Sequence, residues 1–123
     1  MWWKLWLAWI AVIIGATALP WTNYAGHAHW DEVRWIPFYG QPLALGDVFA
    51  NVVLFIPFGF FLRRAMAASS PKRIWILTVL LATALSTAVE IFQIYSHNRV
   101  PSTTDICGNL LGTIIGVLLS VPR

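Results

Sequence analysis

Four long apolar segments account for most of this chain and constrain its fold more than any other feature. They cover residues 2–21, 47–63, 74–95 and 104–121. A membrane-spanning helix needs roughly 20 apolar residues, so each segment is close to the length that crosses a bilayer. Only 11% of the residues are charged and 59% are apolar, whereas a water-soluble domain carries about 25% charged residues. The sequence therefore predicts an all-α membrane protein, a single transmembrane domain over 1–123 with four spanning helices.

Composition also excludes other classes of protein. The single Cys107 excludes a disulfide scaffold, and the high apolar content excludes a disordered chain. Eight Lys and Arg residues against five Asp and Glu residues give a net charge of +3. The cations lie at the ends of the apolar segments rather than on one polar face, so we interpret the charge as membrane topology. No nucleic-acid partner is expected.

The connection between the second and third segments predicts the orientation. Residues 63–73 hold four cations and no acid, which places them on the cytoplasmic side by the positive-inside rule. Both termini are then cytoplasmic, with Lys4 and Arg123, while 22–46 and 96–103 lie outside. This N-in and C-in arrangement puts six cations inside and two outside. We expect a multi-pass protein of the cell membrane.

The first segment has an alternative interpretation. Lys4, the apolar stretch 5–15 and the Ala-Thr-Ala sequence at 16–18 together resemble a secretory signal peptide with its cleavage site. The apolar run continues to Trp21 and begins with bulky tryptophans, so we favour an uncleaved span.

The outer segment 22–46 mixes charged and aromatic residues. It predicts a short helix lying in the membrane interface, stopped by Pro37 and Pro42 before the second span. His27-x-His29 is a candidate metal pattern here, but its spacing matches no strong zinc motif. We expect no metal and no cofactor.

Polar side chains recur at helical spacing near the predicted outer ends of the last three segments. Each carboxylate there has an amide three or four residues away, which places the pair on one helix face. Ionisable residues in spanning helices are costly and rarely face lipid, and an arginine in the short outer loop can fold back onto them. We therefore predict an outward-facing polar cleft. Its candidate ligand-binding residues are Asp47, Asn51, Glu90, Gln93, Arg99, Asp105 and Asn109.

Two functions fit these residues. In a binding site, Arg99 takes a phosphate or carboxylate, and the other residues take hydroxyl or ammonium groups of a lipid headgroup, a lipid-linked precursor or a glycopeptide. In an enzyme, Glu90 acts as general acid or base and His97 carries protons. No nucleophile lies in a recognisable motif, so no catalytic residue is assigned. Helix capping by Asp47 and Asp105 is the structural alternative.

Small residues predict close helix packing. Gly108, Gly112 and Gly116 form a ridge along the fourth segment, and we favour packing within one chain over an oligomer formed through this ridge. Pro57 and Gly59 predict a kink in the second segment, because proline leaves one helical carbonyl without a donor.

A short pattern repeats within the chain. Asp-x-x-x-Asn begins both the second and the fourth segments, at 47–51 and 105–109. Since both segments run inward, this predicts a two-helix internal repeat related by an axis along the membrane normal.

Taken in order, these residues resemble the VanZ-like family over about 46–119. The shared pattern consists of Asn51, Phe-x-Pro-Phe-Gly at 55–59, Glu-x-x-Gln at 90–93, Arg99 and Asp-x-x-x-Asn-x-x-Gly at 105–112. The resemblance implies a small integral protein of the bacterial cell envelope, and the family's namesake is linked to resistance to the antibiotic teicoplanin. It implies no catalytic residues.

Overall fold

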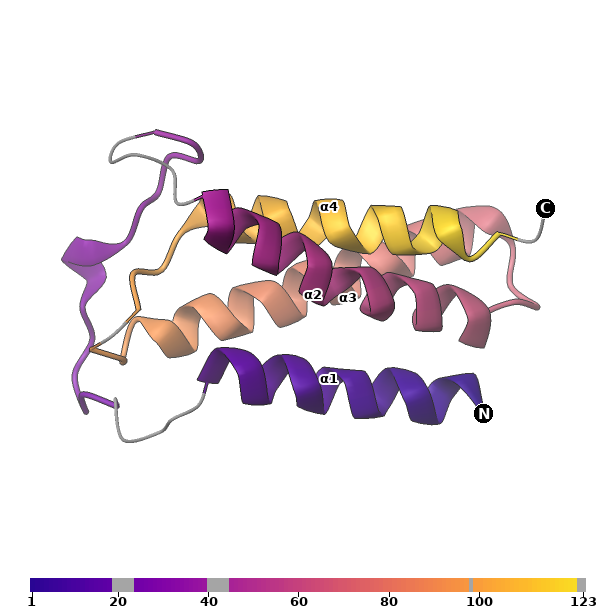
Figure 1. Ribbon diagram of the computed structural model, residues 1–123, viewed down its shortest axis with the longest axis horizontal. Coiled ribbons are helices and arrows are strands. Elements are labelled where there is room, and N and C mark those ends of the chain that lie inside the picture. Colours follow the sequence, from indigo (N-terminus) through magenta and orange to yellow (C-terminus); the bar gives the residue numbers. More distant parts are fainter. Residues whose placement is uncertain (19–23, 40–44, 98, 122–123) are drawn as a thin grey trace.

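The computed structural model describes residues 1–18, 24–39, 45–97 and 99–121. In these residues it contains no strand and four α-helices that run alternately up and down a bundle (Figure 1). The helices are α1 (Trp2–Ala18), α2 (Leu45–Ala65), α3 (Pro71–Gln93) and α4 (Thr103–Leu119), with the short 3-10 helix η2 (Trp30–Glu32) between α1 and α2.

The helices differ in their fit to a bilayer. With 21 and 23 residues, α2 and α3 are long and apolar enough to cross a membrane, whereas α1 and α4 are apolar but have 17 residues each. A helix of 17 residues rises about 26 Å, slightly less than a bilayer core of about 30 Å. The predicted all-helical class is therefore confirmed, and four spans with their orientation stay a prediction. Residues 19–21 of the first predicted span lie outside the described residues.

Capping explains why α3 and α4 begin earlier than predicted. Pro71 occupies the first turn of α3, and the Ser70 hydroxyl accepts the N–H of Arg73 at 3.4 Å. The Ser102 hydroxyl accepts the N–H of Thr104 at 3.1 Å and caps α4. Such caps satisfy the free donors of a helix N-terminus, so α3 starts three residues and α4 one residue before the predicted bounds.

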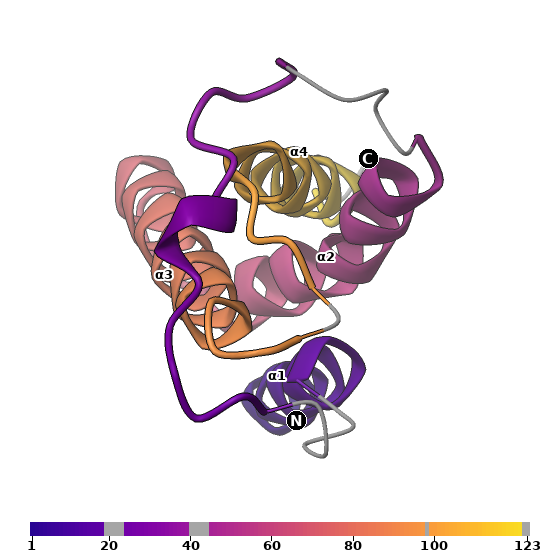
Figure 2. The same cartoon turned by 90° about the vertical axis from the view of Figure 1, so that its left-hand side faces the viewer.

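The predicted interfacial helix is wrong. Apart from η2, residues 24–39 have no helix and cross the end of the bundle where α2 and α4 begin (Figure 2); we call residues 24–39 the strap. Its backbone pairs with the α3–α4 connection, because the Arg34 N–H donates to the Pro101 carbonyl at 2.9 Å and the Thr103 N–H donates to the Arg34 carbonyl at 3.1 Å. The neighbouring segment thus satisfies groups that a helix would satisfy internally. Pro42 lies outside the described residues.

Helix packing is different in the two halves of the bundle. Large apolar side chains fill the space between α1 and α2, among them Trp6, Ile13, Phe55, Phe58 and Leu62. The buried faces of α3 and α4 carry mainly small and polar residues, among them Thr78, Ala82, Ser86, Gly108, Asn109, Gly112 and Thr113. Small side chains let helix backbones approach closely, which is how membrane helices commonly associate.

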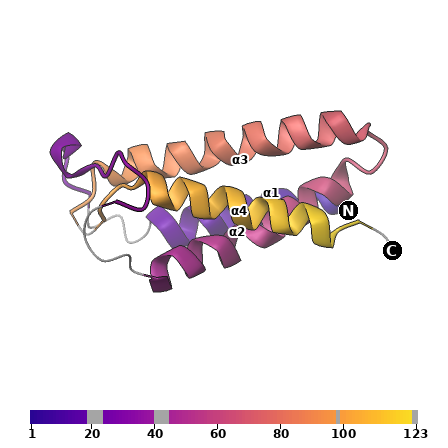
Figure 3. The ribbon, with the colours of Figure 1, turned by 90° about the horizontal axis from the view of Figure 1, so that it is seen from above.

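The glycine ridge of α4 packs against α2 of the same chain, and these two helices make the most extensive contact in the bundle (Figure 3). A Cβ atom added at Gly112 would overlap the carbonyl oxygen of Val52, and one at Gly116 would overlap that of Ile56. Gly59 of α2 meets the backbone of α4 in the same way. The ridge therefore serves contact within the chain.

A hydrogen bond joins α1 to α2 one turn before Pro57. The indole N–H of Trp9 donates to the Leu54 carbonyl at 2.8 Å. Replacing Trp9 by phenylalanine keeps an aromatic ring but removes this donor, and we expect a loss of about 1 kcal/mol in the free energy of unfolding. Thermal unfolding in detergent measures it. Trp3→Phe, at a side chain that is 48% exposed, is the control; equal effects of the two changes would contradict a role for the bond.

Candidate functional site

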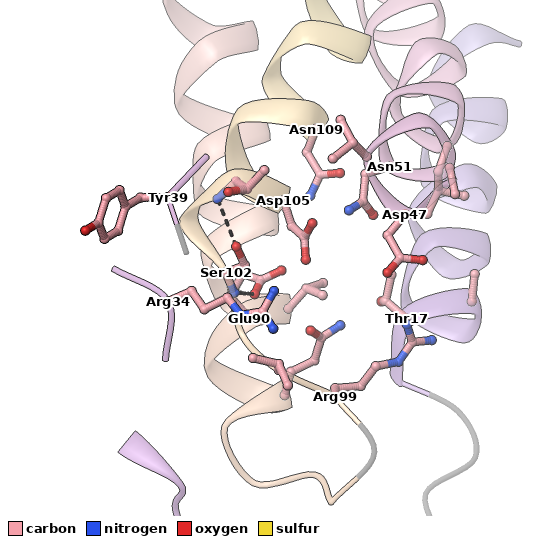
Figure 4. Close-up of a pocket in the computed structure, with 18 residues that line it drawn as sticks. Thr17, Arg34, Tyr39, Asp47, Asn51, Glu90, Arg99, Ser102, Asp105 and Asn109 are labelled. Carbon is pink, nitrogen blue, oxygen red and sulfur yellow. Dashed lines mark hydrogen bonds between the residues drawn. The ribbon is translucent and has the colours of Figure 1, made fainter. Parts of the chain in front are cut away.

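All seven predicted ligand-binding residues line one cavity. The cavity has a volume of about 660 Å³ and lies where α1 and α3 end and α2 and α4 begin (Figure 4). This volume is within the range of small-molecule sites, roughly 300–1,000 Å³. Each helix contributes to the wall, together with the strap and the α3–α4 connection. The polar lining residues are Thr17, Arg34, Tyr39, Asp47, Asn51, Glu90, Gln93, Arg99, Ser102, Thr104, Asp105 and Asn109.

The lining groups are layered by charge. Figure 4 shows the two arginine side chains nearest the connecting loops, the three carboxylates in the middle, and the amides of Asn51 and Asn109 furthest into the bundle. The amides lie one helical turn beyond Asp47 and Asp105, as residues four apart on a helix must. The cavity is therefore cationic at the loop end and rich in carboxylate and amide oxygens toward the middle of the bundle.

Glu90 joins α3 to the beginning of α4. Its side chain is 7% exposed, and its Oε2 atom accepts the Ser102 backbone N–H at 2.7 Å. Ser102 is also the cap of α4, so one carboxylate fixes the position of the helix that presents Asp105 and Asn109. The other carboxylate oxygen of Glu90 faces the cavity (Figure 4).

Asn109 is the most deeply buried amide of the site. It is 3% exposed, and its Nδ2 group donates to the Ser86 hydroxyl of α3 at 2.7 Å. The Oδ1 atom is buried and has no hydrogen-bond partner.

The two Asp-x-x-x-Asn motifs lie on parallel helices around one cavity. This arrangement agrees with the predicted repeat. The repeat of whole helix pairs stays a prediction.

The VanZ/LLP1 family model matches residues 2–121 of the 123-residue chain. The chain belongs to the VanZ/LLP1 family. No curated protein and no solved structure matches it. The match extends beyond the motif-bearing stretch 46–119 to α1 and the strap, so every element that lines the cavity belongs to the VanZ/LLP1 domain.

Sequence reasoning missed Arg34, which reaches the cavity of this VanZ/LLP1 protein from the strap. The sequence of residues 22–46 predicts an interfacial helix, in which an arginine contacts lipid headgroups rather than a pocket. The sequence contained one signal that pointed to Arg34 as a cavity residue. Only Arg34 and Arg99, of eight Lys and Arg residues, fall on the predicted outer side, and both line the cavity. Four further polar residues were missed as lining residues, namely Thr17, Tyr39, Ser102 and Thr104.

A turn of the strap is fastened to the start of α4. The Phe38 N–H donates to the Thr104 hydroxyl at 2.9 Å, and Phe38 has a φ of 59°, a conformation that costs a non-glycine residue energy. Thr104, which accepts this bond, and Tyr39, which follows Phe38, both line the cavity. This bond therefore helps to hold the wall formed by the strap.

Replacing Thr104 by valine is expected to loosen the strap, because valine keeps the shape but accepts no hydrogen bond. A net loss of about 1 kcal/mol in the stability of the closed strap raises the equilibrium constant for its local opening roughly fivefold. Amide hydrogen exchange of the strap measures the change. Thr78→Val on α3, whose hydroxyl has no partner, is the control. Unchanged exchange in Thr104→Val would show that other contacts hold the strap.

The histidines gather away from the carboxylates. The ring centroids of His27 and His29 lie 4.6 Å apart, and His97 lies 6.0 and 5.4 Å from them. His97 follows the end of α3 and does not line the cavity, so its predicted role as proton carrier for Glu90 receives no support from this geometry. No group of three or more His, Cys, Asp or Glu side chains in the described part of the chain is arranged to hold a metal ion.

Proposed function

We propose that this VanZ/LLP1 protein is a multi-pass protein of the cell membrane that binds an envelope headgroup in its polar cavity. One observation carries the proposal. Seven polar residues from three helices and a connecting loop, each costly near a bilayer, converge on a single cavity. Capping or packing alone would not require such convergence.

The distribution of cations supports an outward-facing cavity. Five cations lie at the end of the bundle opposite the cavity (Figure 1). They are on the first turn of α1 or around the α2–α3 connection, and they are Lys4, Arg63, Arg64, Lys72 and Arg73. By the positive-inside rule that end is cytoplasmic. The cavity then opens toward the outer headgroup layer, where lipids, lipid-linked precursors and glycopeptides are available.

Lipids that remain bound after purification test the proposal. We expect mass spectrometry to identify a headgroup-bearing lipid with wild-type protein and at least about tenfold less with Arg99→Ala, since a charge-assisted contact contributes about 1.5–3 kcal/mol. Arg73→Ala, at the opposite end of the bundle, is the matched control. A lipid complement that is the same in all three folded proteins would contradict the proposal.

Susceptibility of a Gram-positive host tests the glycopeptide ligand. Expression of the wild-type chain is expected to lower susceptibility to teicoplanin but not to vancomycin, and well-expressed Glu90→Gln and Arg99→Ala are expected to lose the effect. Glu32→Gln, an exposed change on η2, is the control. No effect of well-expressed wild type would leave the lipid and the lipid-linked precursor as the ligands of the proposal.

An enzymatic alternative uses the same cavity, because Ser102 and Thr104 line it together with the buried Glu90. Glu90 would then be general acid or base toward a lipid-linked envelope substrate. Its observed partner is a backbone N–H rather than a hydroxyl, which favours the binding function. Glu90→Gln separates the two: an enzyme loses turnover and keeps its ligand, whereas a binding protein loses affinity.

A further inference from the structure

The middle of the cavity is rich in acceptors. Asp105 lies within electrostatic range of Asp47 and Glu90, and the two arginines of the loop end lie within range of Asp105. The layer thus holds three carboxylates against two cations. Their carboxylates face one another across the cavity (Figure 4). Like charges repel one another, and ionised carboxylates only accept hydrogen bonds. This layer is therefore complementary to a cation that carries N–H groups.

Asn109 gives an independent sign of the same chemistry. Its Oδ1 atom is buried without a partner while its Nδ2 group is already bonded to Ser86. An unsatisfied buried acceptor destabilises the folded protein, so such groups in native proteins call for an explanation, for example a bound donor. Because Asn109 lines the cavity, a ligand there can supply that donor.

The loop end has the opposite preference. Arg34 reaches it from the strap and Arg99 from the α3–α4 connection, and guanidinium groups match the oxygens of a phosphate in charge and geometry. The two arginines approach the loop end from opposite walls of the cavity (Figure 4). A ligand that fits both the loop end and the middle of the cavity carries a phosphate at one of its ends and a protonated amine at the other.

We infer that the cavity selects a phosphate ester bearing a primary amine, of which a phosphoethanolamine headgroup is the simplest example. The phosphate lies between Arg34 and Arg99, and the ammonium donates to the carboxylate layer and to Asn109. This inference rests on the proposed function and names its ligand class. It predicts discrimination against phosphatidylglycerol, which has no amine, and against phosphatidylcholine, whose nitrogen has no N–H.

A methylation series of one lipid tests the inference. The full chain is placed in nanodiscs containing phosphatidylethanolamine, its N-methyl and N,N-dimethyl derivatives, or phosphatidylcholine, and native mass spectrometry measures the lipid retained. The series keeps the phosphate and removes N–H donors one at a time. We expect retention to fall with each methyl group, by roughly tenfold in total, because each methyl group removes one charge-assisted hydrogen-bond donor.

Variants locate the amine. Asp47→Asn and Asp105→Asn each remove a charge from the middle layer with little change of shape, and we expect each to lower the preference for phosphatidylethanolamine over phosphatidylcholine severalfold. Asp31→Asn on η2, which is exposed and does not line the cavity, is the matched control. Thermal unfolding establishes that each variant is folded.

Glycerophosphoethanolamine distinguishes a free ligand from a membrane lipid. Binding of this soluble headgroup alone points to a free ligand, and retention of only the bilayer lipid points to a membrane source. Equal retention of phosphatidylglycerol and phosphatidylethanolamine, lost together in Arg99→Ala, would overturn the amine inference and leave the proposed function standing. Retention that no cavity variant changes would overturn both.

Discussion

An alanine at Gly112 is expected to destabilise the helix bundle by about 3 kcal/mol or more, in the upper range of overpacking effects. The added Cβ would overlap the Val52 carbonyl oxygen and its neighbouring backbone atoms. A backbone cannot rotate away as a flexible side chain can, so α2 and α4 must separate along their whole contact. Thermal unfolding of purified protein in detergent measures the loss, which appears as a lower unfolding temperature.

The same ridge provides its own control. A Cβ at Gly108 would lie 3.5 Å from the nearest atom, the Cβ of Asn51, which is an ordinary contact, and one at Gly15 of α1 would meet nothing within 4 Å. Gly108→Ala and Gly15→Ala are expected to be neutral or stabilising, since alanine favours helix by about 1 kcal/mol over glycine. Equal behaviour of Gly108→Ala and Gly112→Ala would contradict the close α2–α4 contact.

Two substitutions of Glu90 are expected to separate its structural role from its role in the cavity. Glu90→Ala leaves the Ser102 N–H buried without an acceptor and is expected to lower the free energy of unfolding by about 1–3 kcal/mol. Glu90→Gln keeps an acceptor oxygen for this N–H but removes the charge. It is expected to stay close to wild type in stability and to lose about tenfold in ligand retention.

The measurements are thermal unfolding and lipid retention on the same preparations. Glu32→Gln, an exposed glutamate on η2, controls for loss of charge alone. Should Glu90→Gln retain its lipid fully while Glu90→Ala unfolds easily, Glu90 would have only the structural role of positioning α4.

Much of the site was predictable because helical spacing is a local property. Asp47 with Asn51, and Asp105 with Asn109, share a face in any α-helix, and apolar surroundings favour turning such faces toward a common interior. The structure brings all seven predicted residues to one cavity. Binding of a ligand there stays a prediction.

The strap was not predictable in this way. Arg34 reaches the cavity because its backbone pairs with Pro101 and Thr103, which are far from it in sequence. No periodicity in one segment encodes pairing with another, and a mixed run of charged and aromatic residues fits an interfacial helix equally well. His97 lies beyond the end of α3 at Gln93 and does not line the cavity, so its role as proton carrier stays a prediction.

By itself, the sequence determined the helical class, the family and the polar faces of α2, α3 and α4, because apolar length and helical periodicity act within single segments. The tertiary structure alone decided that the glycine ridge packs against α2, that Glu90 holds Ser102, and that the strap brings Arg34 to the cavity. These are contacts between segments distant in sequence. They depend on the closeness of two backbones and on which buried donor finds which acceptor, and both are set only when all segments pack together.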